Sequence, residues 1–204
     1  MAENRSASLL PTLRHLGEWF HATRTPYVLI GGVAVSFVGR PRITQDIDAT
    51  IVIDDAALNA FIKSGEPFEF VPRIDDPVRF AQASCMLLMA HETDGVKLDI
   101  ALAKSPFERE AIRRAVPFSA GDVKVYVPRV DDLIIMKAVS GRGIDIADID
   151  TLLDVNPGVD RRRIRRLARA FAEGLDEPEI VERLEPLLAQ RRVPFARKKR
   201  RRKR

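Results

Sequence analysis

The apolar positions along the chain follow two different periods, and these predict both strands and helices. Short apolar or alternating runs bounded by turn residues indicate strands, whereas apolar residues three or four apart indicate helices. We predict strands at residues 27–30, 45–53, 86–91, 96–102 and 123–127. We predict helices at residues 7–23, 33–38, 54–64, 105–115, 131–153 with a break at 141–143, 160–173 and 179–190. Residues 65–80 contain three prolines and are interpreted as a loop with one strand at 68–71. The order of elements predicts an α/β (α+β) fold, in which a small mixed sheet is flanked by helices and followed by a helical part.

A glycine pair and an acidic pair lie at two of the predicted strand boundaries. Gly31 and Gly32 end the apolar run at 27–30, and Asp46-Ile47-Asp48 begins the strand at 45–53. Residues two apart on a strand point to one face, so we expect Asp46 and Asp48 to share one or two divalent cations. Glycine lets the backbone approach a phosphate closely, and the first N–H groups of the following helix would face it. A phosphate cradle beside a two-carboxylate metal site is typical of phosphoryl or nucleotidyl transfer.

Two further charged side chains are candidates for the same chemistry. Asp99 lies on the predicted strand at 96–102 with an apolar residue on either side, and it offers a third carboxylate. Charged residues on apolar strands are costly unless they have a ligand or partner. Lys137 lies on an apolar helix face, where it either reaches a triphosphate or extends its ammonium group to the surface. Arg40, Arg42 and Arg142 are likewise either phosphate-facing or solvated.

Composition sets the domain organisation and the expected location. The 204 residues, 46% of them hydrophobic, suit one large domain or a core with a small satellite. We predict a core at 1–127, a helical subdomain at 128–192 and a basic disordered tail at 193–204. The sequence has one cysteine, Cys85, no apolar run long enough to span a membrane and no signal-peptide core. These features favour a cytoplasmic protein with no membrane partner.

The net charge of +5 is misleading, because it comes from one end of the chain. Residues 197–204 carry eight positive charges, so the rest of the chain has a net charge of −3. Such a run either binds RNA or DNA by releasing counterions or is simply solvated. A second cluster of arginines at 161–169 could also bind nucleic acid, but a charged helix face is the more usual explanation.

The glycine and aspartate motifs together resemble the nucleotidyltransferase superfamily of the DNA polymerase β type. In that pattern an apolar residue and a Gly-Gly or Gly-Ser pair precede Asp-x-Asp, and a third Asp follows on a later strand. Ile30-Gly31-Gly32, thirteen intervening residues, Asp46-Ile47-Asp48 and Asp99 match it. Three longer segments of the sequence resemble most closely the AbiEii/AbiGii-type family, which includes toxins of toxin–antitoxin systems. These segments run from Tyr27 to Ala34, from Gly39 to Asp48 and from Asp132 to Asp148.

The resemblance implies a nucleotidyltransferase-type fold and a role for each matching residue. It implies Asp46, Asp48 and Asp99 as catalytic ligands of Mg²⁺ or Mn²⁺. It implies nucleotide contacts from six residues: Gly31, Gly32, Ser36, Arg42, Thr44 and Lys137. Asp145 or Asp148 would support the region around Lys137. The reaction would move an NMP from an NTP, such as ATP, to an acceptor hydroxyl, with tRNA as a candidate acceptor and an antitoxin protein as a candidate partner.

Two other functions were weighed against this one. Asp46-Ile47-Asp48-Ala49-Thr50 also matches the Asp-x-Asp-x-Thr motif of haloacid dehalogenase-type phosphatases, whose first Asp ends a buried strand. Residues 42–45 do not form such a strand, and the apolar run follows the aspartates instead. The remaining alternative is a non-catalytic module that binds nucleotide or RNA on the same fold.

Overall fold

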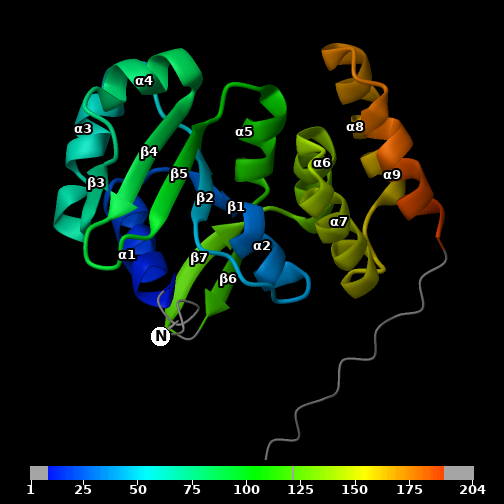
Figure 1. The fold of residues 1–204 in the computed structure, drawn as a ribbon, viewed down its shortest axis with the longest axis horizontal. Coiled ribbons are helices and arrows are strands. Elements are labelled where there is room, and N and C mark those ends of the chain that lie inside the picture. The colour runs from blue at the N-terminus through cyan, green and yellow to red at the C-terminus, as the bar shows by residue number, and fades with distance from the viewer. Residues whose placement is uncertain (1–8, 121, 191–204) are drawn as a thin grey trace, which may run out of the picture. The chain divides into compact units, whose positions relative to one another are not determined.

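The structure, a computed structural model, describes residues 9–120 and 122–190. The predicted basic tail therefore lies outside the described residues. The chain divides into two compact units (Figure 1). Unit 1 comprises residues up to 37 together with 41–129, and unit 2 comprises residues 38–40 together with 130 onward.

Unit 1 combines a five-stranded sheet, a separate hairpin and several helices. Its elements are α1 (Leu9–Ala22), β1 (Tyr27–Ile30), α2 (Gly31–Val38, whose last residue belongs to unit 2), β2 (Ile47–Ile51), η2 (Asp55–Ala57), α3 (Leu58–Lys63), η3 (Glu66–Phe68), β3 (Phe70–Pro72), α4 (Pro77–Ser84), β4 (Met86–His91), β5 (Lys97–Leu102), α5 (Pro106–Arg113), β6 (Val116–Ala120) and β7 (Val123–Val127). The sheet has the order β1-β2-β5-β4-β3, and β6 and β7 form a separate two-stranded sheet. The β2–β5 pair is parallel and the other three pairs of the described sheet are antiparallel, so the sheet is mixed, and the predicted α/β class is confirmed.

The sheet has one fully buried face and one partly open face, as the alternation of side chains along each strand requires. The buried face carries Leu29 of β1, Ala49 of β2, Ile100 of β5 and Leu87 of β4, all at 0% exposure. On the other face, α5 covers one end through Ile112, which packs against Val28. Beyond this end most positions of the second face are half-buried, and both sheet aspartates, Asp48 and Asp99, lie there.

Helix α1 supplies the largest aromatic side chain of the core. Trp19 is fully buried and stacks on Phe61 of α3 and Phe70 of β3, with ring centroids 4.6 and 5.3 Å apart. Its indole N–H donates to the Ser64 hydroxyl at 2.8 Å, so burial leaves no polar atom of the ring unsatisfied. Helix α1 is thereby fixed to the β3 side of the sheet.

Three local predictions were wrong or incomplete. Residues 77–84 form α4 rather than a loop, because Pro77 occupies the first helical turn and the Asp76 carboxylate caps it. Residues 116–120 form β6, an unpredicted strand. The strand that was expected from residue 45 begins at Ile47, so Asp46 lies just before β2.

Unit 2 is helical and contains α6 (Val130–Ser140), α7 (Gly143–Val155), α8 (Arg161–Leu175) and α9 (Glu179–Ala189). Several of the α8 arginines are bound inside this unit. Arg163 contacts Asp131 and Asp132 of α6 at 2.9 and 2.6 Å, and Arg165 contacts Glu185 of α9 at 2.9 Å. These contacts favour a structural role for this part of the arginine cluster. None of the helices in the described part of the chain combines the length and apolar character that a membrane span needs.

Candidate active site

The two sheet aspartates of unit 1 lie side by side. Asp48 of β2 and Asp99 of β5 are partners in the parallel ladder, so their side chains leave the same half-buried face. Neighbouring strands are about 4.8 Å apart, which brings the two carboxylates within reach of one cation. Two like charges directly opposite each other destabilise a sheet unless something compensates them. This pair is therefore the strongest sign of function in the sheet.

Gly31 lies against the Asp48 carboxylate, and its backbone conformation and close packing both require glycine. Its φ is +63°, and a Cβ at this position would lie 1.9 Å from Asp48 Oδ2. The register explains the closeness, because Ile30, the residue before Gly31, is the β1 partner of Asp48. The backbone at the start of α2 thus lies directly against the carboxylate, where a side chain would displace it.

The first turn of α2 also lies against two polar side chains of the loop before β2. A Cβ on Gly32 would meet Thr44 Oγ1 at 2.7 Å and Arg42 Nη2 at 2.9 Å. A helix N-terminus carries unpaired N–H groups and a partial positive charge, and both attract anions. The glycines, Arg42 and Thr44 lie together at the start of α2, and we call this group the glycine cradle. It brings together four of the six predicted nucleotide-binding residues, and their contact with a phosphate stays a prediction.

Ser36 has a different environment from the one that its predicted phosphate contact suggests. Its hydroxyl donates to the carbonyl of Gly32 at 2.9 Å and lies 3.1 Å from the carbonyl of Arg42. The Arg42 amide in turn donates to this hydroxyl at 3.3 Å. In the structure Ser36 joins the loop to α2, so it supports the cradle through Arg42.

Asp46 is exposed and lies one residue before β2, next to the Asp48 position. The Thr44 hydroxyl donates to the Asp46 carbonyl at 3.3 Å and so connects the cradle to this segment. Among the described residues, Asp46, Asp48 and Asp99 do not form a group whose ligand atoms all lie within 4.8 Å of one another. Their donor set nevertheless fits Mg²⁺ or Mn²⁺, because carboxylate oxygens are the ligands that these hard ions prefer.

Sequence reasoning missed Arg73, which follows β3. Its guanidinium Nη2 contacts Asp99 Oδ1, and its backbone N–H donates to Leu88 O at 3.0 Å. Arg73 therefore compensates part of the negative charge on the open face. No local motif marks it, since only the sheet order brings residue 73 beside residue 99.

Lys137 and its predicted supporters lie together in unit 2. The ammonium group contacts Asp145 at 2.7 Å and Asp148 at 2.9 Å, and all three side chains are at most 4% exposed. Burial by itself raises the pKa of Asp145, but hydrogen bonds from Arg142, Lys137 and Ser140 outweigh it and hold that pKa well below its usual range. The group is a buried ion cluster that joins α6 to α7.

The other two predicted arginines also have partners within unit 2. Arg142 precedes α7 and donates to Asp145 from Nε at 2.7 Å. Arg40 contacts Asp154 at 3.1 Å. Both side chains remain more than half exposed.

A large surface hollow lies elsewhere in unit 1. It is lined by α1, β1 and β7, including Phe20, Tyr27 and Tyr126. Burial raises the pKa of Tyr27 to about 12, so its phenol stays protonated at neutral pH. The hollow shares no lining residue with the aspartates or the glycine cradle. Size is a weaker guide to chemistry than the donor set, so we place the candidate site at the aspartates.

Comparison with known families gives one match that spans most of the chain. The family described as "Nucleotidyltransferase of unknown function (DUF6036)" matches residues 12–173. Among curated protein sequences, none matches the chain.

Solved structures show a similar fold at low sequence identity. ANT(2″)-Ia in complex with adenylyl-2″-tobramycin has a TM-score of 0.58 at 15% identity and covers 84% of this chain and 99% of its own. An antigenic nucleotidyltransferase-like protein from Paracoccidioides brasiliensis has a TM-score of 0.53 at 18% identity and covers 91% and 94%. JHP933 from Helicobacter pylori has a TM-score of 0.50 at 12% identity and covers 91% and 90%. These likenesses show the fold.

Proposed function

Because this chain belongs to the nucleotidyltransferase family of unknown function DUF6036, we propose that it transfers an NMP from an NTP to an acceptor hydroxyl. The observation that carries the proposal is the Asp48–Asp99 register pair beside the left-handed Gly31. Two carboxylates directly opposite each other on a sheet repel, and a divalent cation that bridges them to a phosphate would offset this repulsion.

The reaction is an in-line displacement at the α-phosphorus. The acceptor oxygen forms a bond to this phosphorus, the bond to the bridging oxygen of the β-phosphate breaks, and pyrophosphate leaves. Asp46, Asp48 and Asp99 would hold Mg²⁺ or Mn²⁺, which when bound would supply charge neutralisation on the phosphates and a lower pKa of the attacking hydroxyl.

The residues of the chain position the reactants. Gly31 and Gly32 let the triphosphate approach the α2 N-terminus, where Arg42 and Thr44 add a positive charge and a hydroxyl donor. Asp99 orients the acceptor hydroxyl and takes its proton, and Arg73 fixes the direction of the Asp99 carboxylate. Fixed geometry and preorganised charge account for most of the barrier reduction in this scheme.

The sequence also makes more specific predictions about the acceptor of the NMP and about the biological role of the protein. The crystallised complex of ANT(2″)-Ia contains an adenylylated small molecule, and this supports trying hydroxyl-bearing small molecules as acceptors. A tRNA acceptor, an AbiEii/AbiGii affiliation, a toxin role with an antitoxin and a direct contact of Ser36 or Lys137 with the nucleotide stay predictions.

The test is incubation of the full chain with each of four α-labelled NTPs and Mg²⁺ or Mn²⁺. Cellular RNA and a panel of hydroxylated small molecules serve as acceptors, and pyrophosphate release is followed in parallel. We expect transfer from at least one NTP and its loss in Asp48→Ala. Binding of NTP without label transfer or pyrophosphate release, across all acceptors, would instead favour the non-catalytic module.

A further inference from the structure

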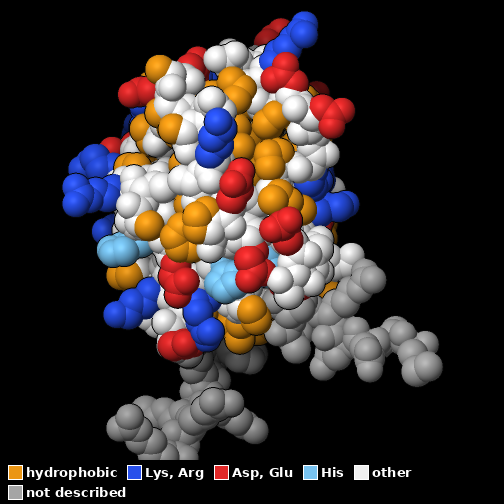
Figure 2. Space-filling model, turned by 90° about the vertical axis from the view of Figure 1, so that its left-hand side faces the viewer, with side chains coloured by type: hydrophobic (Ala, Val, Ile, Leu, Met, Phe, Trp, Pro, Cys, Tyr) orange, Lys and Arg blue, Asp and Glu red, His pale blue; other side chains and the backbone are white. Residues whose placement is uncertain are grey.

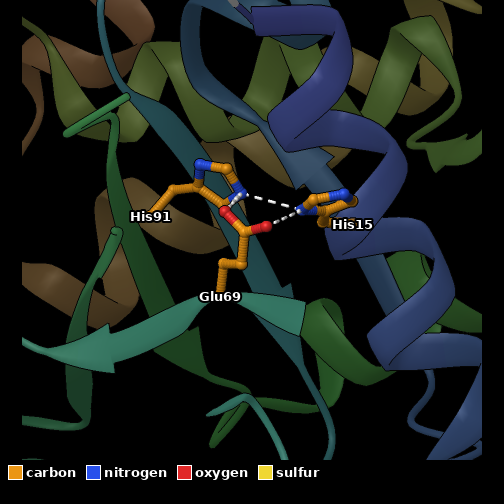
Figure 3. A group of neighbouring side chains, drawn as sticks. All are labelled: His15, Glu69 and His91. Carbon is orange, nitrogen blue, oxygen red and sulfur yellow. Dashed lines mark hydrogen bonds and ion pairs between the residues drawn. The ribbon is translucent and has the colours of Figure 1, made fainter. Parts of the chain in front are cut away.

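A second cluster of metal-ligating side chains lies in unit 1, away from the aspartates. His15 of α1, Glu69 before β3 and His91 at the end of β4 bring their ligand atoms within 4.8 Å of one another (Figure 3). Among the described residues this is the only group of three or more such side chains that converges so closely. Its members come from three separate segments, so only the fold assembles it.

The distances within the cluster lie within about 0.7 Å of those around a bound transition metal. His15 Nδ1 and His91 Nε2 are 2.9 Å apart, and Glu69 oxygens lie 4.0 and 3.5 Å from these two nitrogens. Ligands at about 2.0–2.1 Å in tetrahedral geometry are separated by about 3.3 Å. To bind one ion, the two nitrogens would separate by about 0.4 Å and the Glu69 carboxylate would move toward His15 by about 0.7 Å.

The surrounding groups favour the ligand form of His91. Asp94 Oδ1 lies 3.0 Å from His91 Nδ1, although the N–H is not aligned with it as a hydrogen bond. The Val96 amide donates to the same carboxylate at 3.0 Å and helps to fix its position. A carboxylate at Nδ1 favours the proton on that nitrogen, so the Nε2 lone pair faces His15 and Glu69.

Neighbouring contacts hold the other parts of the cluster in place. The His91 ring is 2% exposed and packs edge-on against Phe70, with centroids 5.3 Å apart. The Glu92 amide donates to the Glu69 carbonyl at 2.9 Å, and the Thr93 hydroxyl donates to the Glu69 carboxylate. Ligands that are fixed before binding lose less entropy when a metal arrives.

Charge and access are also suitable for a cation. Glu69 and Asp94 contribute two negative charges beside the two imidazoles, and a divalent cation would balance these charges. The side chains of His15 and Glu69 are 32% and 41% exposed, so the cluster opens to solvent. Figure 2 shows histidine surface among acidic side chains on this face of the molecule.

This cluster is separate from the candidate active site. Along β4, Leu88 is the partner of Asp99, whereas Leu87, Met89 and His91 alternate onto the opposite, buried face. The two sites therefore lie on opposite faces of the sheet. Their chemistry differs as well, because imidazole nitrogens favour zinc-class ions over Mg²⁺.

We propose that His15, Glu69 and His91 bind one zinc-class divalent metal ion, which joins α1 to the β3–β4 edge of the sheet. Asp94 is a positioning residue that acts through His91. The site is distinct from the proposed Mg²⁺ site at the aspartates. Its role is to stabilise the folded protein rather than to take part in nucleotide transfer.

The test is metal titration of the full-length, tag-free chain after treatment with a chelator. Zn²⁺ is titrated by calorimetry, and Co²⁺ is followed by visible absorption. We expect one Zn²⁺ per chain and a rise in Tm of about 5–10 °C at a hundredfold excess over Kd. The Co²⁺ spectrum should be that of nitrogen and oxygen ligation, without the charge-transfer band of a thiolate from Cys85.

A set of variants tests whether metal binding depends on this cluster rather than on the remaining histidine or on the aspartates of the candidate active site. His15→Ala and Glu69→Gln should weaken binding by at least about 100-fold and abolish the Tm rise, and Asp94→Asn should weaken binding by about 10–100-fold. His21→Ala removes the remaining histidine of the chain and should change nothing. Asp48→Ala should still bind one Zn²⁺, so failure of either proposal leaves the other intact.

The partly exposed positions 15 and 69 keep the test valid even if variants of the buried His91 do not fold. Absence of stoichiometric Zn²⁺ or Co²⁺ binding would overturn the proposal, because the imidazole pair would then be a simple hydrogen-bonded contact. Undiminished binding in both His15→Ala and Glu69→Gln would also overturn it.

Discussion

Unit 1 and unit 2 each contain a close pair of aspartates, but the two pairs have opposite surroundings. Asp48 and Asp99 lie on the open face of a sheet, half-buried, with Arg73 on one of them. Asp145 and Asp148 are almost fully buried, and both contact the ammonium group of Lys137. The second pair is buried around one lysine, whereas the first remains partly exposed and lies beside the glycine cradle.

The surroundings of the two aspartate pairs indicate which pair has a structural role and which has a functional role, whereas the residue types are the same in both. A buried carboxylate with a buried cation holds two helices together, and its charge is not available to a ligand. A carboxylate pair on a partly exposed face remains accessible to an external cation, which would offset the repulsion between the two charges. We therefore expect substitutions in the first pair to affect activity and substitutions in the second pair to affect stability.

The largest expected effect is on transfer in Asp48→Asn. Removing one metal-binding carboxylate should lower the rate by a factor on the order of 10³, with little change in the urea midpoint. The measurement is label transfer from the NTP together with urea unfolding. A rate change below tenfold would contradict the assignment of Asp48.

The next largest effect is on stability in Lys137→Met. Two buried carboxylates would lose their shared cation, and the free energy of unfolding should fall by about 3–5 kcal/mol. Urea unfolding measures it, with Arg166→Ala, an exposed cation of the same unit, as a control expected within about 0.5 kcal/mol. A stable, folded Lys137→Met protein with lost transfer would instead support the predicted nucleotide contact.

A smaller effect on stability is expected from alanine substitution at two glycines of unit 1 that have a left-handed backbone conformation, and activity should distinguish the two variants. Gly31 and Gly95 have φ values of +63° and +68°, but only Gly31 has a neighbour where a Cβ would stand. Both alanine variants should lose about 1–2 kcal/mol through backbone strain. Only Gly31→Ala should also displace Asp48 and lose transfer activity. Equal activity in the two variants would argue against a close role for the Gly31 turn.

The smallest effect concerns acid stability. The pKa of Asp145 is lowered in the folded state, so its ionised form stabilises the protein above the unfolded pKa of about 3.9. That contribution is lost as the pH falls below this value toward the folded pKa. We expect Asp145→Asn to flatten the pH dependence of Tm below about pH 4. An unchanged acid slope would show that other carboxylates control acid unfolding.

The sequence predicted well where the signal is local. The strand at 86–91 and its turn to β5 follow from alternating side chains and Thr93-Asp94-Gly95, and both are confirmed. The helix at 77–84 was missed because Pro77 suggests a loop, although proline is favourable in a first turn. The strand at 116–120 was missed, and Pro117 lies within it, where it weakens a strand pattern.

The sequence alone determined most of the elements and the glycine turn, and it predicted Asp46, Asp48 and Asp99 as the candidate carboxylates, because these depend on periodicity and short spacing. The tertiary structure alone decided that Asp48 and Asp99 share a register position and that Arg73 contacts Asp99. It also decided that Lys137 is buried between two aspartates and that His15 and His91 meet across 76 residues of chain. These are long-range encounters, and they are set by strand order and helix packing, which no local pattern encodes.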